Sequence, residues 1–259
     1  MRALHAVLAA LQCAALLAIA GWGAALWATS AQAKSTTPSY ARAEVGPQPV
    51  ALPETTVVAP VAGSVAASVV APAVSNSARI DPSWLDTVSL NTGIPRIALA
   101  AYAGAATVLA ESSPQCHLGW NTLAAIGHIE SDDGRHGGAI LSDNGYSSVP
   151  IIGPRLDGGA FAGIHDSDGG VWDGDSVWDH AVGPFQFIPQ TWRTWGADGN
   201  GDGQANPNQL DDAALTAARY LCHAGDMSTV DGWRRAIFSY NHSESYVDDV
   251  AKVANSYRS

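Results

Sequence analysis

The stretch 120–131, "WNTLAAIGHIES", decides how the chain folds. Leu123, Ile126 and Ile129 recur every three residues, which is typical of an α-helix that buries one face. The stretch is apolar almost to its end, where Glu130 leads into a segment rich in glycine. We therefore expect a buried helix that brings one carboxyl group to the edge of the core.

Helical patterns also flank this stretch. Asp81 and Pro82 supply a cap and a first-turn proline for a helix that ends near Gly93. Further helices are expected over 95–109, 209–224, 229–241 and 243–257. Between Gly134 and Gly183 the chain is rich in Gly, Asp, Ser and Pro, which predicts loops or a short hairpin. The expected fold class is mainly α, with long Gly/Asp-rich loops and a small β-hairpin.

The N-terminal third predicts export and a spacer. Residues 1–33 hold an apolar stretch that ends in the small-x-small pattern Ala31-Gln32-Ala33, typical of a cleaved signal peptide. The stretch is also long enough to be an uncleaved membrane anchor, and either reading places the rest outside the cytoplasm. Residues 34–79 carry six prolines and five charges, which predicts a disordered linker. Residues 80–259 then form one domain, large enough to bury a core.

The charge balance excludes one class of partner. The 259 residues carry 13 Lys and Arg against 24 Asp and Glu, a net charge of −11. No basic cluster exists beyond Arg234 and Arg235, so nucleic acid is not an expected partner. Ten Asp and one Arg lie between Asp157 and Asp212, which is 10 − 1 = 9 of the 11 net negative charges. The acidity therefore belongs to loops.

Two cysteines, Cys116 and Cys222, lie beyond the leader. An even count in an exported chain predicts a disulfide, here closing a loop of roughly 100 residues and contributing roughly 4–5 kcal/mol. Two free thiols are the alternative. A zinc site is disfavoured, because His117 and His223 directly follow the cysteines instead of standing at ligand spacing.

Glu130 is the leading catalytic candidate on its position alone. A carboxyl group at the end of an apolar helix face is desolvated, which raises its pKa. A carboxyl group that stays protonated near neutral pH can donate its proton to a glycosidic oxygen. The alternative is a helix-end Glu in a solvated ion pair.

Four motifs then follow one another in order: "IGHIES" at 126–131, "AVGPFQFIPQTW" at 181–192, "DGNGDGQANPNQLDDAALTAARYL" at 198–221 and "AIFSYN" at 236–241. Together they resemble the lytic murein transglycosylases of the membrane-bound type B family, particularly their exported actinobacterial relatives. The resemblance covers roughly residues 90–259. It implies a lysozyme-like domain that cleaves the β-1,4 bond between N-acetylmuramic acid and N-acetylglucosamine.

The resemblance also implies a mechanism. Glu130 matches the single catalytic acid/base, which protonates the leaving oxygen and then takes the proton of the muramoyl 6-hydroxyl. That hydroxyl attacks the anomeric carbon and leaves a 1,6-anhydro ring, so neither water nor a cofactor enters the chemistry. The implied partner is the peptidoglycan glycan strand. We expect a monomer, located extracellularly or in the cell envelope.

Four further residues match the family's substrate-binding positions: Ser131, Gln186, Tyr240 and Asn241. Ser131 and Tyr240 are each expected to hydrogen-bond Glu130 or to contact the sugar. The Gln186 amide can both donate to and accept from an N-acetyl group. The alternatives are a loop-ordering amide for Gln186 and a core aromatic for Tyr240.

The sequence departs from the family after the catalytic position. His128 stands where relatives often carry Arg, and Asp132 and Asp133 follow Ser131. If either carboxylate activated water, the protein would be a hydrolytic muramidase. The alternative is that both are solvated loop charges. A non-catalytic peptidoglycan-binding domain is the alternative from another class.

Two acidic loops are candidate cation sites. The segment 198–209 has the spacing of an EF-hand loop, which predicts a structural Ca²⁺ held by Asp198, Asn200, Asp202, Gln204 and Gln209. Gln209 replaces the usual bidentate Glu, and Asp211 or Asp212 could substitute for it; the alternative is a turn that needs no ion. In the segment 165–179, Trp172 and Trp178 are either sugar-stacking platforms or core residues, and the aspartates either bind a cation or cap turns.

Overall fold

The structure is a computed structural model that describes residues 74–257. The signal peptide or anchor expected at 1–33, and residues 34–73 of the expected linker, lie outside the described residues. Residues 74–79 were expected in the linker, but the 3-10 helix η1 (Asn76–Arg79) packs on helix α3 (Arg96–Ser112). Gly104 makes this contact possible, because a Cβ there would lie 2.5 Å from the Asn76 backbone. Residues 76–79 therefore pack with the helical domain.

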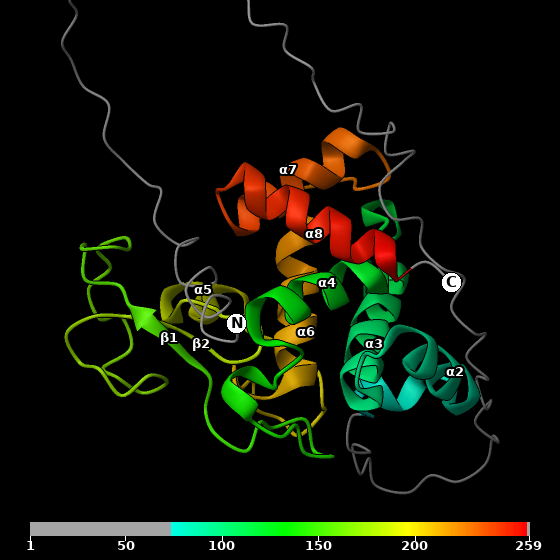
Figure 1. Cartoon of the computed structure of the whole chain (residues 1–259), viewed down its shortest axis with the longest axis horizontal. Coiled ribbons are helices and arrows are strands. Elements are labelled where there is room, and N and C mark those ends of the chain that lie inside the picture. The colour runs from blue at the N-terminus through cyan, green and yellow to red at the C-terminus, as the bar shows by residue number, and fades with distance from the viewer. Residues whose placement is uncertain (1–73, 258–259) are drawn as a thin grey trace, which may run out of the picture.

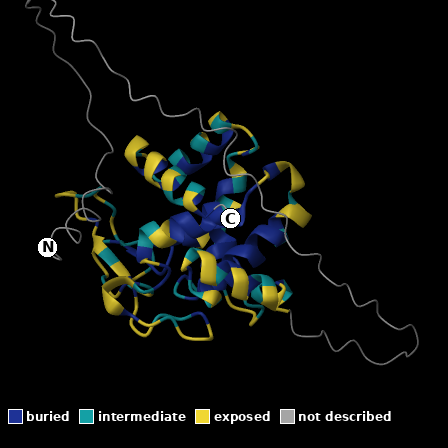
Figure 2. Cartoon of the chain, turned by 45° about the vertical axis from the view of Figure 1, so that its right-hand side comes forward, coloured by how far each residue is buried: buried dark blue, intermediate teal, exposed yellow. Residues whose placement is uncertain are grey.

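Helix α3 lies between α6 (Leu210–His223) and α2 (Pro82–Thr92) (Figure 1). Helices α2, α4 (Trp120–Ser131) and α6 all pack against it. Every residue of α3 from Ala98 to Thr107 is buried, and most are alanines, which allow close approach between helices. Figure 2 shows the buried residues concentrated in these central helices, with the exposed ones on the surrounding loops.

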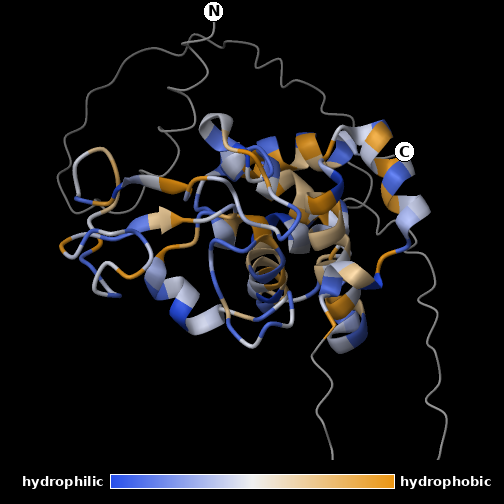
Figure 3. Cartoon of the chain, turned by 90° about the horizontal axis from the view of Figure 1, so that it is seen from below, coloured by the Kyte–Doolittle hydropathy of each residue, from blue (hydrophilic) through white to orange (hydrophobic). Residues whose placement is uncertain are grey.

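Helix α8 (Glu244–Ser256) packs against α4, and helix α7 (Val230–Tyr240) packs against α8 and α6. Both bury one face only, and Figure 3 shows apolar and polar residues alternating along the helix that ends near the C label. Each begins at a side-chain cap: the Thr229 hydroxyl accepts a hydrogen bond from the Gly232 N–H, and the Ser243 hydroxyl accepts one from the Tyr246 N–H. Helix α4 is thus enclosed on both sides.

A small antiparallel sheet carries the long loops to one side of the helices (Figure 1). Strand β1 (Ile152–Arg155) pairs with β2 (His180–Val182), with Ile152 opposite Val182 and Arg155 opposite His180. Isolated bridges continue the pairing into the loop between the strands. The expected hairpin is confirmed, and a turn joins the end of β2 to the short helix α5 (Pro189–Trp195).

The mainly α fold class with long loops is confirmed, and all six expected helices are present. Helix α3 continues to Ser112, beyond the expected end at 109, while α5 and the short 3-10 helices η2 (Pro114–Cys116) and η3 (His136–Gly138) were not expected. Within residues 74–257, no single helix has the length and apolar character needed to cross a membrane. Helices α2 and α3 have this length and apolar character only when taken together, as a pair bent by 117°.

Cys116 and Cys222 form the predicted disulfide, with their Cα atoms 5.3 Å apart. Cys116 ends η2, just before α4, and Cys222 lies in the last turn of α6. The Cys116 carbonyl also accepts a hydrogen bond from the Met227 N–H. The bridge therefore ties the start of the Glu130 helix to the far end of α6.

Removing this bridge should destabilise the domain strongly. Because the bond spans 106 residues, we expect the double variant Cys116→Ser/Cys222→Ser to lose about 4 kcal/mol of unfolding free energy. Urea denaturation of the oxidised protein, the reduced protein and the double variant measures this loss. The reduced protein should have the same unfolding free energy as the variant, and reductant should not change the unfolding free energy of the variant. A variant within about 1 kcal/mol of the oxidised protein would contradict the expectation.

Candidate active site

Glu130 is the second-to-last residue of α4, and it is partly exposed at the edge of the helical core. Burial by the surrounding groups raises the pKa of its carboxyl from 4.5 to about 7, while a hydrogen bond from Tyr246 opposes that rise. The Tyr246 hydroxyl donates to Glu130 Oε1 at 2.6 Å, from the first turn of α8. The site therefore holds a carboxyl group that is poised to give and take a proton near neutral pH.

Ser131 acts on the backbone and not on Glu130. Its side chain is buried, its Oγ donates to the Pro184 carbonyl at 2.7 Å, and it accepts from the Gly134 N–H at 2.9 Å. The Ser131 hydroxyl is thus bonded to backbone groups instead of to Glu130, and its contact with the sugar stays a prediction. Since Pro184 lies 53 residues further along, this hydroxyl joins the end of α4 to the turn that carries the second motif.

The turn at 181–187 is tightly built. Val182 and Phe187 exchange two backbone hydrogen bonds, of 2.9 and 3.0 Å, which close it. Gly183 has a φ of +74°, and any side chain there would collide with the Pro207 carbonyl. Only glycine satisfies both conditions, which explains its place in the motif.

Gln186 lies at the end of this turn, with a φ of +48°. Its Nε2 donates to the Gly183 carbonyl at 2.9 Å and, at a longer 3.4 Å, to the Ile151 carbonyl. Its Oε1 faces strand β1 so closely that a Cβ at Gly153 would lie 2.6 Å from it. The Gln186 amide thus orders the loop, while the residue stays partly exposed.

Tyr240 also binds the turn. Its hydroxyl donates to the Phe185 carbonyl at 2.6 Å, so the expected hydrogen bond to Glu130 is made by Tyr246 instead. Asn241 follows as the cap that ends α7, and it is partly exposed. Nothing in the spacing of Tyr246 distinguishes it from a core aromatic of an amphipathic helix, and for this reason the sequence did not single it out.

The first half of the loop at 198–209 keeps the expected geometry. The two carboxylate oxygens of Asp198 accept from the Gly201 and Gly203 N–H groups, each at 2.7 Å. Asn200 Oδ1 accepts from the Asp202 N–H at 2.9 Å, and its amide donates to Asp202 Oδ2 at 3.0 Å. The three oxygen-bearing side chains are therefore close together on one turn.

The second half does not fit the expected ligand set. Gln209 is buried and caps α6, because its Oε1 accepts from the Asp212 N–H at 2.9 Å, so it is not placed as a bidentate ligand. The buried Asp212 carboxylate instead accepts from backbone N–H groups of the loop, those of Gly199, Asn200 and Asn206. Burial raises the pKa of Asp212 to about 6. This carboxylate closes the loop from within the protein.

The acidic segment 165–179 is organised by its own backbone. Each of its aspartates accepts at least one main-chain N–H, as expected for turn caps: Asp166, Asp168, Asp173, Asp175 and Asp179. Oxygens of Asp166, Asp168 and Asp179 lie within 4.8 Å of one another, close enough to share a cation. Trp178 stacks on His165 with ring centroids 4.2 Å apart, and Trp172 packs against the core.

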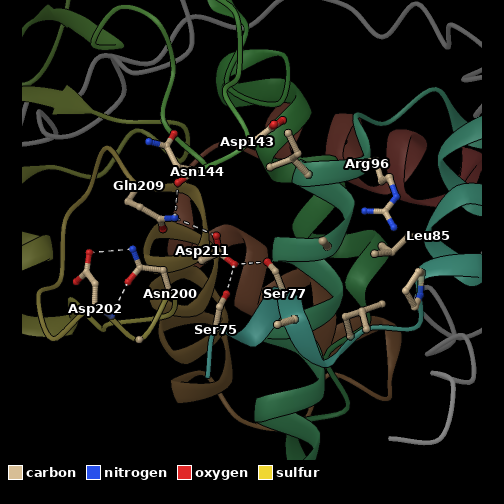
Figure 4. Close-up of a pocket in the computed structure, with 16 residues that line it drawn as sticks. Ser75, Ser77, Leu85, Arg96, Asp143, Asn144, Asn200, Asp202, Gln209 and Asp211 are labelled. Atoms are coloured by element: carbon tan, nitrogen blue, oxygen red, sulfur yellow. Dashed lines mark hydrogen bonds between the residues drawn. The ribbon is translucent and has the colours of Figure 1, made fainter. Parts of the chain in front are cut away.

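A pocket of about 620 Å³ lies elsewhere, between η1, the start of α3 and the N-terminus of α6, and Glu130 does not line it. Figure 4 shows Asp211 between two groups of side chains. Its Oδ1 accepts from the hydroxyls of Ser75 and Ser77, while its Oδ2 accepts from Gln209 Nε2 at 3.0 Å. These bonds fix η1 and the residue before it to the start of α6.

A model of the family described as "Transglycosylase SLT domain" matches residues 170–234. Residues 170–234 are therefore similar to this family. This segment spans the end of the acidic loop, the 181–187 turn, helices α5 and α6 and part of α7, and it leaves out Glu130. No curated protein matches the chain.

Among solved structures, the crystal structure of SltB3 from Pseudomonas aeruginosa in complex with NAG-anhNAM-pentapeptide is similar to this chain. The identity is 18%, the alignment covers 68% of this chain and 67% of that chain, and the TM-score is 0.40.

The raised pKa of Glu130 predicts a pH-dependent stability effect. Because the folded pKa of about 7 exceeds the ordinary 4.5, the unfolded state ionises first, so stability falls as the pH rises from about 4.5 to about 7 and stays lower above that range. At pH 4 the group is mainly protonated in both states. We expect Glu130→Gln to stabilise the protein by about 2–3 kcal/mol at pH 8 and to change little at pH 4. Urea denaturation at both pH values measures this.

Glu111→Gln is the matched control, since Glu111 is an exposed carboxylate paired with Arg79. It should change stability by less than about 1 kcal/mol at either pH. Equal effects of Glu130→Gln at pH 4 and pH 8 would contradict the proposed burial of the carboxyl.

Proposed function

We propose that the protein is a peptidoglycan lytic transglycosylase with Glu130 as its acid/base. The observation that carries the proposal is the partly exposed Glu130 carboxyl, whose pKa of about 7 suits a group that must first donate and then accept a proton. The family match to residues 170–234 supports the same activity from a separate part of the chain. The four ordered motifs support the lysozyme-like character of the domain.

In the proposed reaction, the protonated Glu130 donates to the oxygen that links N-acetylmuramic acid to N-acetylglucosamine, and the bond from the anomeric carbon to that oxygen breaks. The Tyr246 hydroxyl, 2.6 Å away, then stabilises the carboxylate that forms. This carboxylate takes the proton of the muramoyl 6-hydroxyl while the oxygen of that hydroxyl bonds to the anomeric carbon. The product is a 1,6-anhydro sugar, and Glu130 returns to its starting state.

The surroundings of Glu130 favour this route over hydrolysis. Hydrolysis with inversion needs a second carboxylate that activates water. Asp133 is buried, and Asp132 is paired with Arg135 at 2.9 Å, so neither is presented as a free base. A substrate hydroxyl held close to the anomeric carbon needs no such base beyond Glu130 itself.

We propose that the glycan strand lies along the 181–187 turn, in contact with Gln186 and Asn241. Both residues are partly exposed, whereas Ser131 is buried and supports the turn from below. We propose that the protein acts as an exported monomer in the cell envelope, where this substrate is found.

Digestion of purified sacculi tests the proposal. We expect wild-type protein to release muropeptides that are one water lighter than hydrolysis products, and Glu130→Gln to release none while Glu111→Gln matches the wild type. Reducing-end products would identify a hydrolytic muramidase. Binding to sacculi without any release would identify a non-catalytic peptidoglycan-binding domain, and either result would overturn the proposal.

We further propose that the 198–209 loop binds Ca²⁺ weakly, through Asp198, Asn200 and Asp202 and the Gln204 carbonyl, without Gln209. Exposed sites with few charged ligands typically have dissociation constants of about 10⁻⁴–10⁻³ M. When bound, the ion would neutralise part of the acidic loop and would take no part in the reaction.

Thermal unfolding tests this cation site. At ten times the dissociation constant, Ca²⁺ should stabilise the protein by about 1.4 kcal/mol, seen as a rise in Tm of a few degrees. The variant Asp202→Asn should lose the rise, and Mg²⁺ should give less of it. Equal Tm values in Ca²⁺, in chelator and in Asp202→Asn would contradict the site.

A further inference from the structure

The turn that follows Glu130 and Ser131 has an unusual backbone. Asp132 and Asp133 are consecutive residues with φ values of +51° and +58°. The left-handed region is disfavoured for residues with a side chain, and two such residues in a row persist only where the surroundings hold them. The contacts that hold this turn therefore also affect the end of α4, where Glu130 lies.

The Asp133 side chain makes these contacts. It is only 2% exposed, and its Oδ1 accepts a hydrogen bond from the Tyr102 hydroxyl at 3.1 Å. Its Oδ2 lies 3.6 Å from His128 Nδ1 and 3.6 Å from Arg135 Nη2. A buried carboxylate is thus surrounded by one neutral donor and two basic groups, and the carboxylate raises the pKa of His128 in turn.

Tyr102 reaches this carboxylate by passing close to the backbone of α4 at Gly127, which has no side chain. A Cβ at Gly127 would collide with the Tyr102 hydroxyl, so glycine at this position lets the ring of a core residue of α3 pass beneath the helix. Tyr102 is itself fully buried. The hydroxyl therefore meets Asp133 at a fixed position inside the core.

The backbone of the same turn closes the helix. The Asp132 N–H donates to the His128 carbonyl at 2.8 Å, and the Asp133 N–H donates to the Gly127 carbonyl at 3.1 Å. These two carbonyls belong to the last turn of α4, which contains Glu130. If the turn opened, that last turn would lose both bonds and the Glu130 carboxyl would move relative to Tyr246.

We propose that Asp133 is a positioning residue for Glu130: held by the Tyr102 hydroxyl, it locks the left-handed turn that fixes the last turn of α4. Asp133 does not touch Glu130 and acts through the backbone. The expected effect of Asp133 on turnover rests on the proposed function. Its effect on the placement of Glu130 rests on the geometry alone. A misplacement of a catalytic group by about 1 Å can cost as much as about 100-fold in rate.

The test compares Asp133→Asn with Asp132→Asn. Both remove one charge, and asparagine tolerates the left-handed region at both positions, so backbone strain is matched. Asp132 is the control because its side chain is 53% exposed and is not bonded to Tyr102. We expect Asp133→Asn to slow the release of muropeptides at least about tenfold, and Asp132→Asn to stay within about twofold of the wild type.

A second readout does not depend on activity. The stabilisation that Glu130→Gln brings at pH 8 reports how well the carboxyl is buried, so it should fall to half or less in the Asp133→Asn background and stay unchanged in the Asp132→Asn background. Both readouts at wild-type values in Asp133→Asn would overturn the proposal. If Glu130→Gln still cleaves while this pattern of stabilisation holds, the proposed function fails and the positioning role stands.

Tyr102→Phe provides the check if Asp133→Asn does not fold. It removes only the hydroxyl that binds Asp133, and it should lower both readouts in the same direction. Where Asp133→Asn does fold, the effects of the two changes should not add, because both break one interaction. A Tyr102→Phe variant that matches the wild type in both readouts contradicts the proposal.

Discussion

Desolvation of one carboxyl group is the constraint on which the rest of the site depends. Glu130 stands at the end of helix α4, which packs against α3, α6 and α8. This enclosure raises its pKa to about 7, and the single hydrogen bond from Tyr246 keeps the ionised form accessible. Without the enclosure, a carboxyl group at a helix end would simply ionise in water, and it would have no proton to donate at neutral pH.

The motif residues around Glu130 act mainly on the backbone. The Ser131 hydroxyl holds the Pro184 carbonyl, and the Tyr240 hydroxyl holds the neighbouring Phe185 carbonyl. Two helices thus fix adjacent peptide units of one turn, and Gln186 follows directly. The acidity of the chain has a similar role, because the loop aspartates accept main-chain N–H groups. In the proposed function, these contacts arrange a surface along which a glycan strand can lie.

The helices were predictable from the sequence because periodicity and caps are local signals: Asp81 caps α2 as expected, and Cys116 and Cys222 pair. The candidate Glu130 came from the same kind of signal. The residues that contact Glu130 could not be predicted from such local signals. Whether Tyr240 or Tyr246 reaches the carboxyl depends on how α7 and α8 cross α4, and Gln209 caps a helix because α6 starts there. The Tyr102–Asp133 contact spans 31 residues and passes through a gap at Gly127, which no spacing rule indicates.

The central claim is that burial keeps Glu130 protonated near neutral pH. A direct measurement is the titration of its carboxyl carbon by ¹³C NMR in protein labelled at glutamate, which is tractable because the chain has few glutamates: Glu44, Glu54, Glu111, Glu130 and Glu244. One resonance should titrate near pH 7 in the wild type, disappear in Glu130→Gln and move to higher pH in Tyr246→Phe, since that variant loses the bond that lowers the pKa. A Glu130 resonance that titrates near the ordinary 4.5 would contradict the account.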